Sequence, residues 1–289
     1  MTPTYLLRLG TPLSFFFGRV NRGLGELSRW FRCNRLTLNL KKTEYVYFGR
    51  PGGRETPPGG LVIGGVEIRR VEGARFLGVW VDEGLRWTGH IEKVRAKVGQ
   101  LLGVLGRAGS SLGGRSLLSL YNALVLPRLQ YCLMAWGDFR EGRNLTLGES
   151  LARYQKRCVR LIAGVGSRSH ADPLLAEYGV LKVGDLYRQQ LRVHAWRFWK
   201  GRLPPNQSAM LGRVGDVHRH ATRSAVSGLF LSTRDHRSVG YRIPKEWATV
   251  SEVQRGVGSL GAFKRGSRAG FLAGYRAFRC GGCRVCGGV

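Results

Sequence analysis

The stretch HIEKVRAKVGQLLGVL at residues 90–105 places apolar side chains at helical spacing and lysines on another side. The apolar positions recur every three or four residues and are Ile91, Val94, Val98, Leu101, Leu102 and Leu105. Lys93 and Lys97 are four residues apart. Because residues at these spacings share one face of an α-helix, the stretch predicts an amphipathic helix with a basic outer face.

The same pattern, with apolar residues at helical spacing and cations on another face, recurs along the chain and predicts a helical bundle with basic outer faces. The further segments are 117–125, 147–162, 183–200 and 259–276, and Pro127 is expected to break or kink the first of them. The cations on the predicted outer faces of the second and third are Arg153, Lys156, Arg157, Arg160, Arg188 and Arg192.

Shorter apolar runs before residue 90 predict a small β-region. Residues 20–33 have helical spacing, and 43–48 have the β-branched and aromatic content of a strand. LVIGGVEIRR at 61–70 and ARFLGVWVD at 74–82 predict two strands that pair with each other as one hairpin. We therefore expect a small antiparallel sheet over 36–82 and an α+β fold for the whole chain.

The charge of the chain points to a polyanionic partner. Lys and Arg number 47 against 18 Asp and Glu, which leaves a net charge of +29 at pH 7. A charge of this size repels itself unless an anion is near, and arginine suits phosphate, so RNA, DNA or an RNA/DNA hybrid is the expected partner. A GC-rich gene is an alternative source of part of the arginine excess. No signal peptide or membrane span is visible, so a soluble intracellular protein, nuclear or cytoplasmic, is expected.

No catalytic residue is assigned from the sequence. Asp82 and Glu83 form an acidic pair before Gly84, where turn formation is favoured over metal binding. His218 and His220 lie in an arginine-rich segment without an acidic neighbour, and His194 fits a core or boundary position. The run WRFWKGR at 196–202 fits two structures equally, a stacking surface for nucleic acid or a helix that buries its aromatic rings.

A cysteine cluster lies at the C-terminal end, at Cys280, Cys283 and Cys286. Thiolates at this spacing could hold zinc or part of an iron–sulfur cluster, but a closed tetrahedral site needs a fourth ligand from elsewhere. An oxidation-prone tail without metal is the alternative.

Several segments, taken in order, resemble the C-terminal half of the reverse transcriptase of non-LTR, LINE-like (jockey-type) retrotransposons. They are LSRWFRCNRLTLNLKKTEYVYFGR at 27–50, ARFLGVWVDEGLRWTGHIEKVRAK at 74–97, LYNALVLPRLQYCLMAWG at 120–137, YQKRCVRLIAG at 154–164 and HADPLLAEYGVLKVGDLYRQQ at 170–190. The resemblance implies a palm remnant (18–88) after an N-terminal tail (1–17), followed by a helical thumb (89–203). Beyond Pro204 and Pro205 the periodicity weakens, so the composition predicts a poorly ordered, Arg/Gly-rich C-terminal region (204–289).

The resemblance also implies roles for particular residues. Phe76, Leu77 and Gly78 would belong to a hairpin that grips the primer. The thumb would hold the template–primer duplex through the cations of its helical faces. Lys41 and Lys42, in the palm remnant, are further candidate nucleic-acid-binding residues. The family uses Mg²⁺ held by an aromatic-Ala-Asp-Asp turn, but no acidic residue precedes Glu26 here.

The expectation is therefore a reverse-transcriptase fragment that binds nucleic acid, needs no cofactor of its own and does not polymerise alone. The missing polymerase half would be a further partner. Two alternatives stay open, a zinc-binding nucleic-acid module and a decayed reading frame without a selected role.

Overall fold

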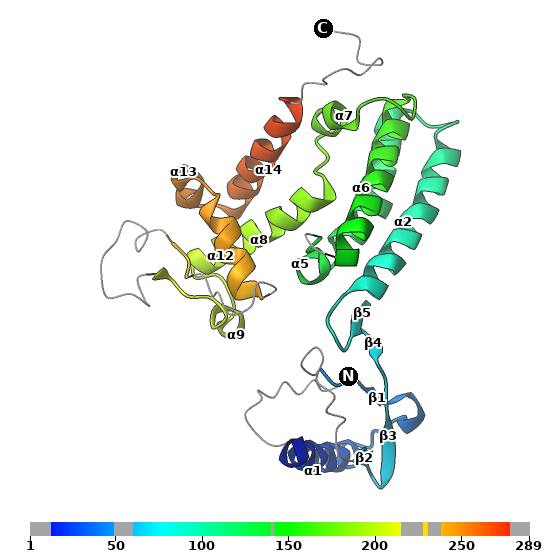
Figure 1. Ribbon diagram of the computed structural model, residues 1–289, viewed down its shortest axis with the longest axis vertical. Helices are drawn as coiled ribbons and strands as arrows, with labels where there is room; N and C mark the ends of the chain where they lie inside the picture. Colours follow the sequence, from blue (N-terminus) through cyan, green and yellow to red (C-terminus); the bar gives the residue numbers. More distant parts are fainter. Residues whose placement is uncertain (1–12, 49–59, 140–141, 215–227, 231–237, 278–289) are drawn as a thin grey trace. The chain divides into compact units, whose positions relative to one another are not determined.

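The computed structural model describes residues 13–48, 60–139, 142–214, 228–230 and 238–277 (Figure 1). The chain divides into an N-terminal unit, Met1–His90, and a helical unit, Ile91–Val289. Among the described residues, no helix is both long enough and apolar enough to cross a lipid bilayer.

The N-terminal unit packs one long helix on a small sheet. The helix α1 (Leu13–Cys33) covers the strands β1 (Glu44–Tyr45), β2 (Leu61–Ile63) and β3 (Val66–Arg70), in the order β1-β3-β2. A 3₁₀ turn, η1 (Leu40–Lys42), precedes β1. The apolar core between helix and sheet consists of Phe17, Leu24, Leu61, Ile63 and Ile68. The prediction of an antiparallel sheet was wrong in part, because β1 pairs with β3 in parallel.

Each of the two predicted strands is itself a hairpin. The first run folds as β2 and β3 around Gly64 and Gly65, and the second as β4 (Gly73–Phe76) and β5 (Val79–Asp82) around Leu77 and Gly78. All four turn residues have positive φ, between 46° and 87°. Two-residue turns of this kind follow the natural twist of paired strands, so the chain reverses within each run. The prediction of a single hairpin built from both runs was therefore wrong.

The helical unit begins with the predicted helix at 90–105, which is confirmed as α2 (Thr88–Ala108). The second predicted helix is broken into α3 (Gly114–Leu120), the π-helical turn η2 (Tyr121–Val125) and α4 (Leu126–Gln130). Pro127 follows this wide turn. Proline has no N–H to donate and its ring crowds the carbonyl four residues earlier, so a wider turn before it relieves both problems.

The third predicted helix is confirmed as α6 (Gly142–Ala163), which follows the short helix α5 (Leu133–Trp136) and precedes α7 (Ala171–Glu177). Gln155 of α6 is buried and joins distant segments. Its Nε2 donates to the Tyr121 hydroxyl at 2.9 Å and to the Leu181 carbonyl at 2.8 Å, and its Oε1 accepts from the Val183 N–H at 3.0 Å. These bonds tie α6 to η2 and to the start of the helix that begins at Val183.

The last part of the helical unit is built on α8 (Val183–Trp199), which packs against α12 (Val239–Ala248) and α14 (Leu260–Arg276). Two short helices, α9 (Pro205–Ser208) and α13 (Glu252–Gly256), lie between them in the chain. The helix expected at 259–276 is confirmed, and the Ser259 side chain caps it by accepting from the Ala262 N–H.

The expectation of a poorly ordered region from residue 204 onward was wrong for 238–277. Ile243, Trp247 and Phe263 from α12 and α14 are almost fully buried. These side chains supply the apolar surface that covers α8, so helices from both sides of residue 204 share one core.

Candidate nucleic-acid interface

The outer face of α6 carries the densest group of exposed cations predicted from the sequence. Arg153 and Arg157 are exposed, and Lys156 and Arg160 are half-buried. The opposite face is buried and consists of Leu151, Gln155, Cys158, Val159 and Ile162. This division follows from helical geometry, because positions 156, 157 and 160 lie three, four and seven residues after position 153. We call these four residues the α6 basic face.

Three members of the α6 basic face have no ionic partner in the part of the chain that the structure describes. Among the residues that the structure describes, Arg153, Lys156 and Arg157 take part in no ion pair. Arg160 is held in place, because its Nε donates to the Ser169 carbonyl at 2.6 Å. A polyanion would therefore meet available charges on most of this face.

The neighbouring helix α2 carries further cations. Lys93 and Lys97 are exposed, and Lys97 Nζ donates to Gln100 Oε1 at 3.3 Å. Figure 1 shows α2 beside α6, and a Cβ at Gly99 would lie 3.6 Å from the Tyr154 ring. Cations thus lie on two adjacent helices of the same unit.

The prediction that Arg188 and Arg192 point outward was wrong for Arg192, which is buried, whereas 42% of the Arg188 side chain stays exposed. Arg192 is only 8% exposed, and its Nε donates to Glu246 Oε1 at 2.7 Å. Arg188 bonds Glu246 at 3.1 Å and Asp185 at 3.3 Å. The helices α12 and α14 cover this side of α8, so both guanidinium groups serve the internal structure.

The electrostatics of Arg188 agree with an internal role. Partial burial disfavours its charged form and lowers the pKa, but the hydrogen bonds and negative charges of Glu246 and Asp185 outweigh burial and raise the pKa above its usual value.

His194, also on α8, has a pKa shifted downward. Burial, and to a lesser degree the charge of Arg197, lower the pKa of His194, which fits the boundary position expected for it.

Other predicted site residues lie in the N-terminal unit. Lys41 and Lys42 are exposed in η1, where the Asn39 side chain accepts from the Lys42 N–H. At the tip of the β4–β5 hairpin, Phe76 is 44% and Leu77 75% exposed, and Gly78 forms the turn with Leu77. These exposed apolar groups leave the primer-grip role of Phe76, Leu77 and Gly78 a prediction.

The acidic pair at 82 and 83 forms a turn, as predicted. The two carboxylate oxygens of Asp82 accept from the backbone N–H groups of Arg86 and Trp87, each at 2.9 Å. Glu83 pairs with Arg70 at 3.1 Å. Both carboxylates are therefore used within the N-terminal unit.

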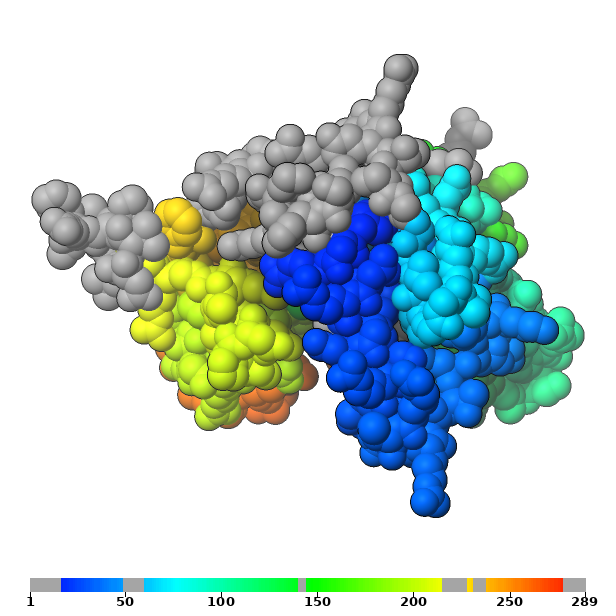
Figure 2. All heavy atoms as spheres, turned by 90° about the horizontal axis from the view of Figure 1, so that it is seen from below, coloured from blue at the N-terminus to red at the C-terminus, as the bar shows by residue number. Residues whose placement is uncertain are grey.

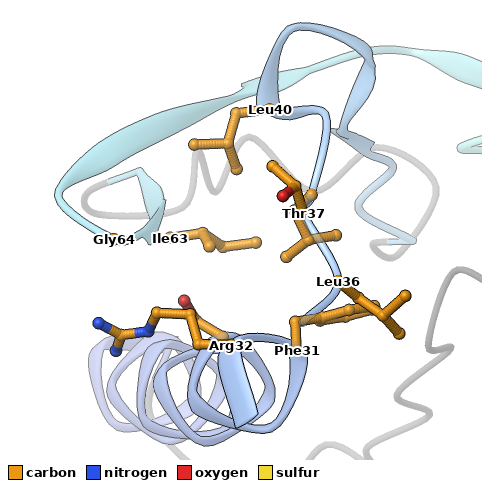
Figure 3. A pocket seen from close by; sticks show the side chains of 9 residues that line it. Phe31, Arg32, Leu36, Thr37, Leu40, Ile63 and Gly64 are labelled. Carbon is orange, nitrogen blue, oxygen red and sulfur yellow. The ribbon is translucent and has the colours of Figure 1, made fainter. Parts of the chain in front are cut away.

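A small pocket in the N-terminal unit has no Asp, Glu, His or Cys side chain among its lining residues. Its volume is about 190 Å³, and it lies between the end of α1 and the chain leading to η1 (Figure 3). The lining residues are Ser28, Phe31, Arg32, Leu36, Thr37, Leu38, Leu40, Ile63 and Gly64. Arg32 is the one charged residue among them, and Figure 3 shows its guanidinium group at the edge. The pocket is mainly a gap in apolar packing.

The metal prediction concerns residues outside the described part of the chain. Cys280, Cys283 and Cys286 lie there, as do His218 and His220. Within the described ranges, no three His, Cys, Asp or Glu residues gather as a metal site. Zinc at the terminal cysteines stays a prediction.

The choice left open for the aromatic run at 196–202 is settled for Trp196. Its side chain is fully buried, its ring stacks on Phe263 with centroids 5.9 Å apart, and its Nε1 donates to the Val257 carbonyl at 3.1 Å. The sequence did not indicate that Arg213 and Arg255 would lie over neighbouring tryptophan rings. For Arg213, the sequence offered one indication of a cationic surface: no acidic residue occurs between Asp185 and Asp216.

Comparisons with protein-family models, with curated proteins and with solved structures found no match.

Proposed function

We propose that this chain is part of a non-LTR retrotransposon reverse transcriptase and that its helical unit binds the phosphate backbone of RNA, DNA or an RNA/DNA hybrid. The observation that carries the proposal is the α6 basic face, where Arg153, Lys156 and Arg157 are accessible and without ion pairs among the described residues. The sequence resemblance, which assigns this helix to a polymerase thumb, supports the same partner.

The geometry of the face suits a backbone rather than particular bases. A helix rises about 1.5 Å per residue, so the cations from 153 to 160 extend over about 10 Å. Such a row meets a few successive phosphates, which position a nucleic acid without selecting its sequence. Glu149, one turn before Arg153, is exposed on the same side and limits the face at that end.

Polymerisation is not part of the proposal. The family's reaction uses magnesium ions held by aspartates, and the positions where the resemblance expects them carry no acidic residue before Glu26. Asp82 does not substitute for them, because its oxygens accept from turn amides. The residues present thus do not fit the magnesium site of the family.

The test is the salt dependence of binding to a fluorescent RNA/DNA hybrid, followed by anisotropy. Each phosphate neutralised contributes about −0.9 to the slope of log K against log salt for B-DNA. The variant Arg153→Gln/Lys156→Gln/Arg157→Gln is therefore expected to flatten the slope by about 2 to 3 and to weaken binding at low salt.

A charge-matched control removes three exposed cations from other helices, with Arg115→Gln, Arg128→Gln and Lys245→Gln. Its slope should stay close to that of the unaltered protein. Equal effects of the two triple variants, or binding of the unaltered protein that is insensitive to salt, would contradict the proposal. Templated primer extension by this chain with Mg²⁺ would contradict the statement that it does not polymerise alone.

A further inference from the structure

Three arginines of the helical unit lie over three tryptophan rings. The guanidinium carbon of Arg202 is 5.2 Å from the ring centroid of Trp196, that of Arg213 is 4.8 Å from Trp199, and that of Arg255 is 5.4 Å from Trp247. These distances are within the range of cation–π attraction, about 6 Å. We call this group the Arg–Trp cluster.

The rings form one continuous and rigid base for the arginines. Trp199 lies 6.1 Å from Trp247, and Trp247 lies 6.2 Å from Phe263, which in turn stacks on Trp196 at 5.9 Å. Trp196 and Trp247 are fully buried and Phe263 is 1% exposed. The three rings that the guanidinium groups contact therefore belong to one packed aromatic group, although the arginines come from segments far apart in the chain.

Hydrogen bonds hold two of the arginines in place. Arg213 Nη2 donates to the Trp199 carbonyl at 3.1 Å, and Arg255 Nη2 donates to the carbonyls of Trp247 and Ala248 at 3.0 and 3.3 Å. These carbonyls end α8 and α12, where a positive charge is favourable. The bond from Arg213 uses a single nitrogen, and a guanidinium carries five N–H donors, so this side chain has further donors to offer an anion.

The cluster is accessible, and two of its three arginines lie in a stretch of the chain that is rich in cations. Arg202 and Arg213 are exposed and Arg255 is half-buried. Figure 2 shows the segment that follows α8, in yellow, at the surface of the molecule. Arg197 and Lys200 are in the same stretch, and no acidic residue occurs between Asp185 and Asp216.

We infer that the Arg–Trp cluster binds single-stranded nucleic acid. A guanidinium that lies on a ring leaves its second face open, and unpaired bases stack on arginine planes as they do on aromatic rings. The N–H groups at its edge are then placed to bond the adjacent phosphates. A duplex keeps its bases inside, so this surface favours unpaired strands and is separate from the α6 basic face.

The test compares single-stranded and duplex probes in the full chain. The probe is a labelled oligonucleotide of about 12 residues, within the range of about 4 to 16 that single-strand sites cover. Arg202→Lys/Arg213→Lys keeps the charge but removes the planar groups. Because a stacked base contributes about 1–3 kcal/mol, single-strand affinity should fall at least about fivefold, while binding of the RNA/DNA hybrid stays unchanged.

Two further probes separate stacking from charge. An abasic strand with the same number of phosphates should bind the unaltered protein at least about fivefold more weakly than the intact strand. Polyglutamate of similar charge should not displace the intact strand at equal concentration. Arg153→Gln/Lys156→Gln/Arg157→Gln should weaken the hybrid and leave the single strand nearly unaffected, so this proposal can fail or hold independently of the α6 basic face.

The inference is overturned if the lysine variant binds the single strand as tightly as the unaltered protein, or if the abasic strand or polyglutamate competes equally with the intact strand. Arg213 also bonds the end of α8, so its replacement could alter the helix as well as the surface. Arg202→Lys is therefore measured alone too, because the contact of Arg202 within the cluster is with the Trp196 ring. Unchanged thermal unfolding of that variant assigns a loss of affinity to the surface rather than to misfolding.

Discussion

Replacing Glu246 with glutamine should destabilise the helical unit, because two arginines share this carboxylate. Glu246 of α12 lies between Arg188 and Arg192 of α8 and is 12% exposed. Its carboxylate accepts from Arg192 Nε at 2.7 Å and from Arg188 Nε at 3.2 and 3.1 Å. Glu246→Gln preserves the shape of the side chain and removes the charge that neutralises both guanidinium groups.

The expected loss follows from the number and kind of these bonds. A hydrogen bond to a charged group contributes about 1.5–3 kcal/mol and a neutral one about 0.5–1.5, so three weakened bonds amount to about 3 kcal/mol. Breaking a buried ion pair usually costs about 3–5 kcal/mol. The lower end applies, because Asp185 still neutralises Arg188 at 3.3 Å.

Urea unfolding followed by circular dichroism measures this loss. A decrease of about 3 kcal/mol corresponds to a melting temperature lower by about 6–12 °C for a unit of this size. Glu177→Gln is the matched control, because Glu177 is exposed and its replacement should change stability by less than about 0.5 kcal/mol.

A second variant tests whether an unpaired buried charge causes the loss. Glu246→Gln/Arg192→Met removes the carboxylate together with its most buried partner, so it should be less destabilised than the sum of the two single variants. A loss below about 1 kcal/mol for Glu246→Gln, or strict additivity in the double variant, would refute this explanation.

Two other expectations concern close packing and pH. Gly114→Ala places a Cβ 2.5 Å from the Ile162 carbonyl oxygen and should lower stability by about 1–3 kcal/mol. Gly106→Ala in α2 meets nothing within 4 Å and should raise stability by about 0.5–1 kcal/mol. Thermal melts in which the two variants show the reverse order of stability would contradict both expectations. Burial raises the pKa of the Cys158 thiol from 9.0 to about 12. Its contribution to stability is therefore complete below pH 9 and is lost as the pH rises toward 12, so Cys158→Ala should lose less stability over that interval in urea titrations than the unaltered protein. Identical pH dependence of the two would argue against this role of the thiol.

The sequence alone predicted the helices whose signals are local. The apolar spacing at 90–105 predicted α2, and the amphipathic run after Ser259 predicted α14. The interruption at Pro127 was also predicted, since the missing N–H is a property of the residue itself. Turns were less well predicted. Gly64 and Gly65 carry a hairpin signal within a run that otherwise has the composition of one strand, whereas Leu77 at positive φ carries no such signal.

The candidate interface shows what only the tertiary structure decided. Arg153 and Arg157 on α6, and Arg188 and Arg192 on α8, have the same spacing of four residues and the same apparent position opposite an apolar face. The first pair is exposed. In the second pair Arg192 is buried and Arg188 is partly exposed but ion-paired, because Glu246, 54 residues beyond Arg192, comes with α12 to the same side of α8.

Helical periodicity describes how residues of one helix are arranged, and it was sufficient to say that each helix has a basic side. Whether that side meets solvent or another helix depends on contacts between segments far apart in the chain, and no local pattern records them. The charge of this protein was thus determined by its composition, whereas the packing of α12 and α14 on α8 decided which of the cations on α8 remain accessible and unpaired.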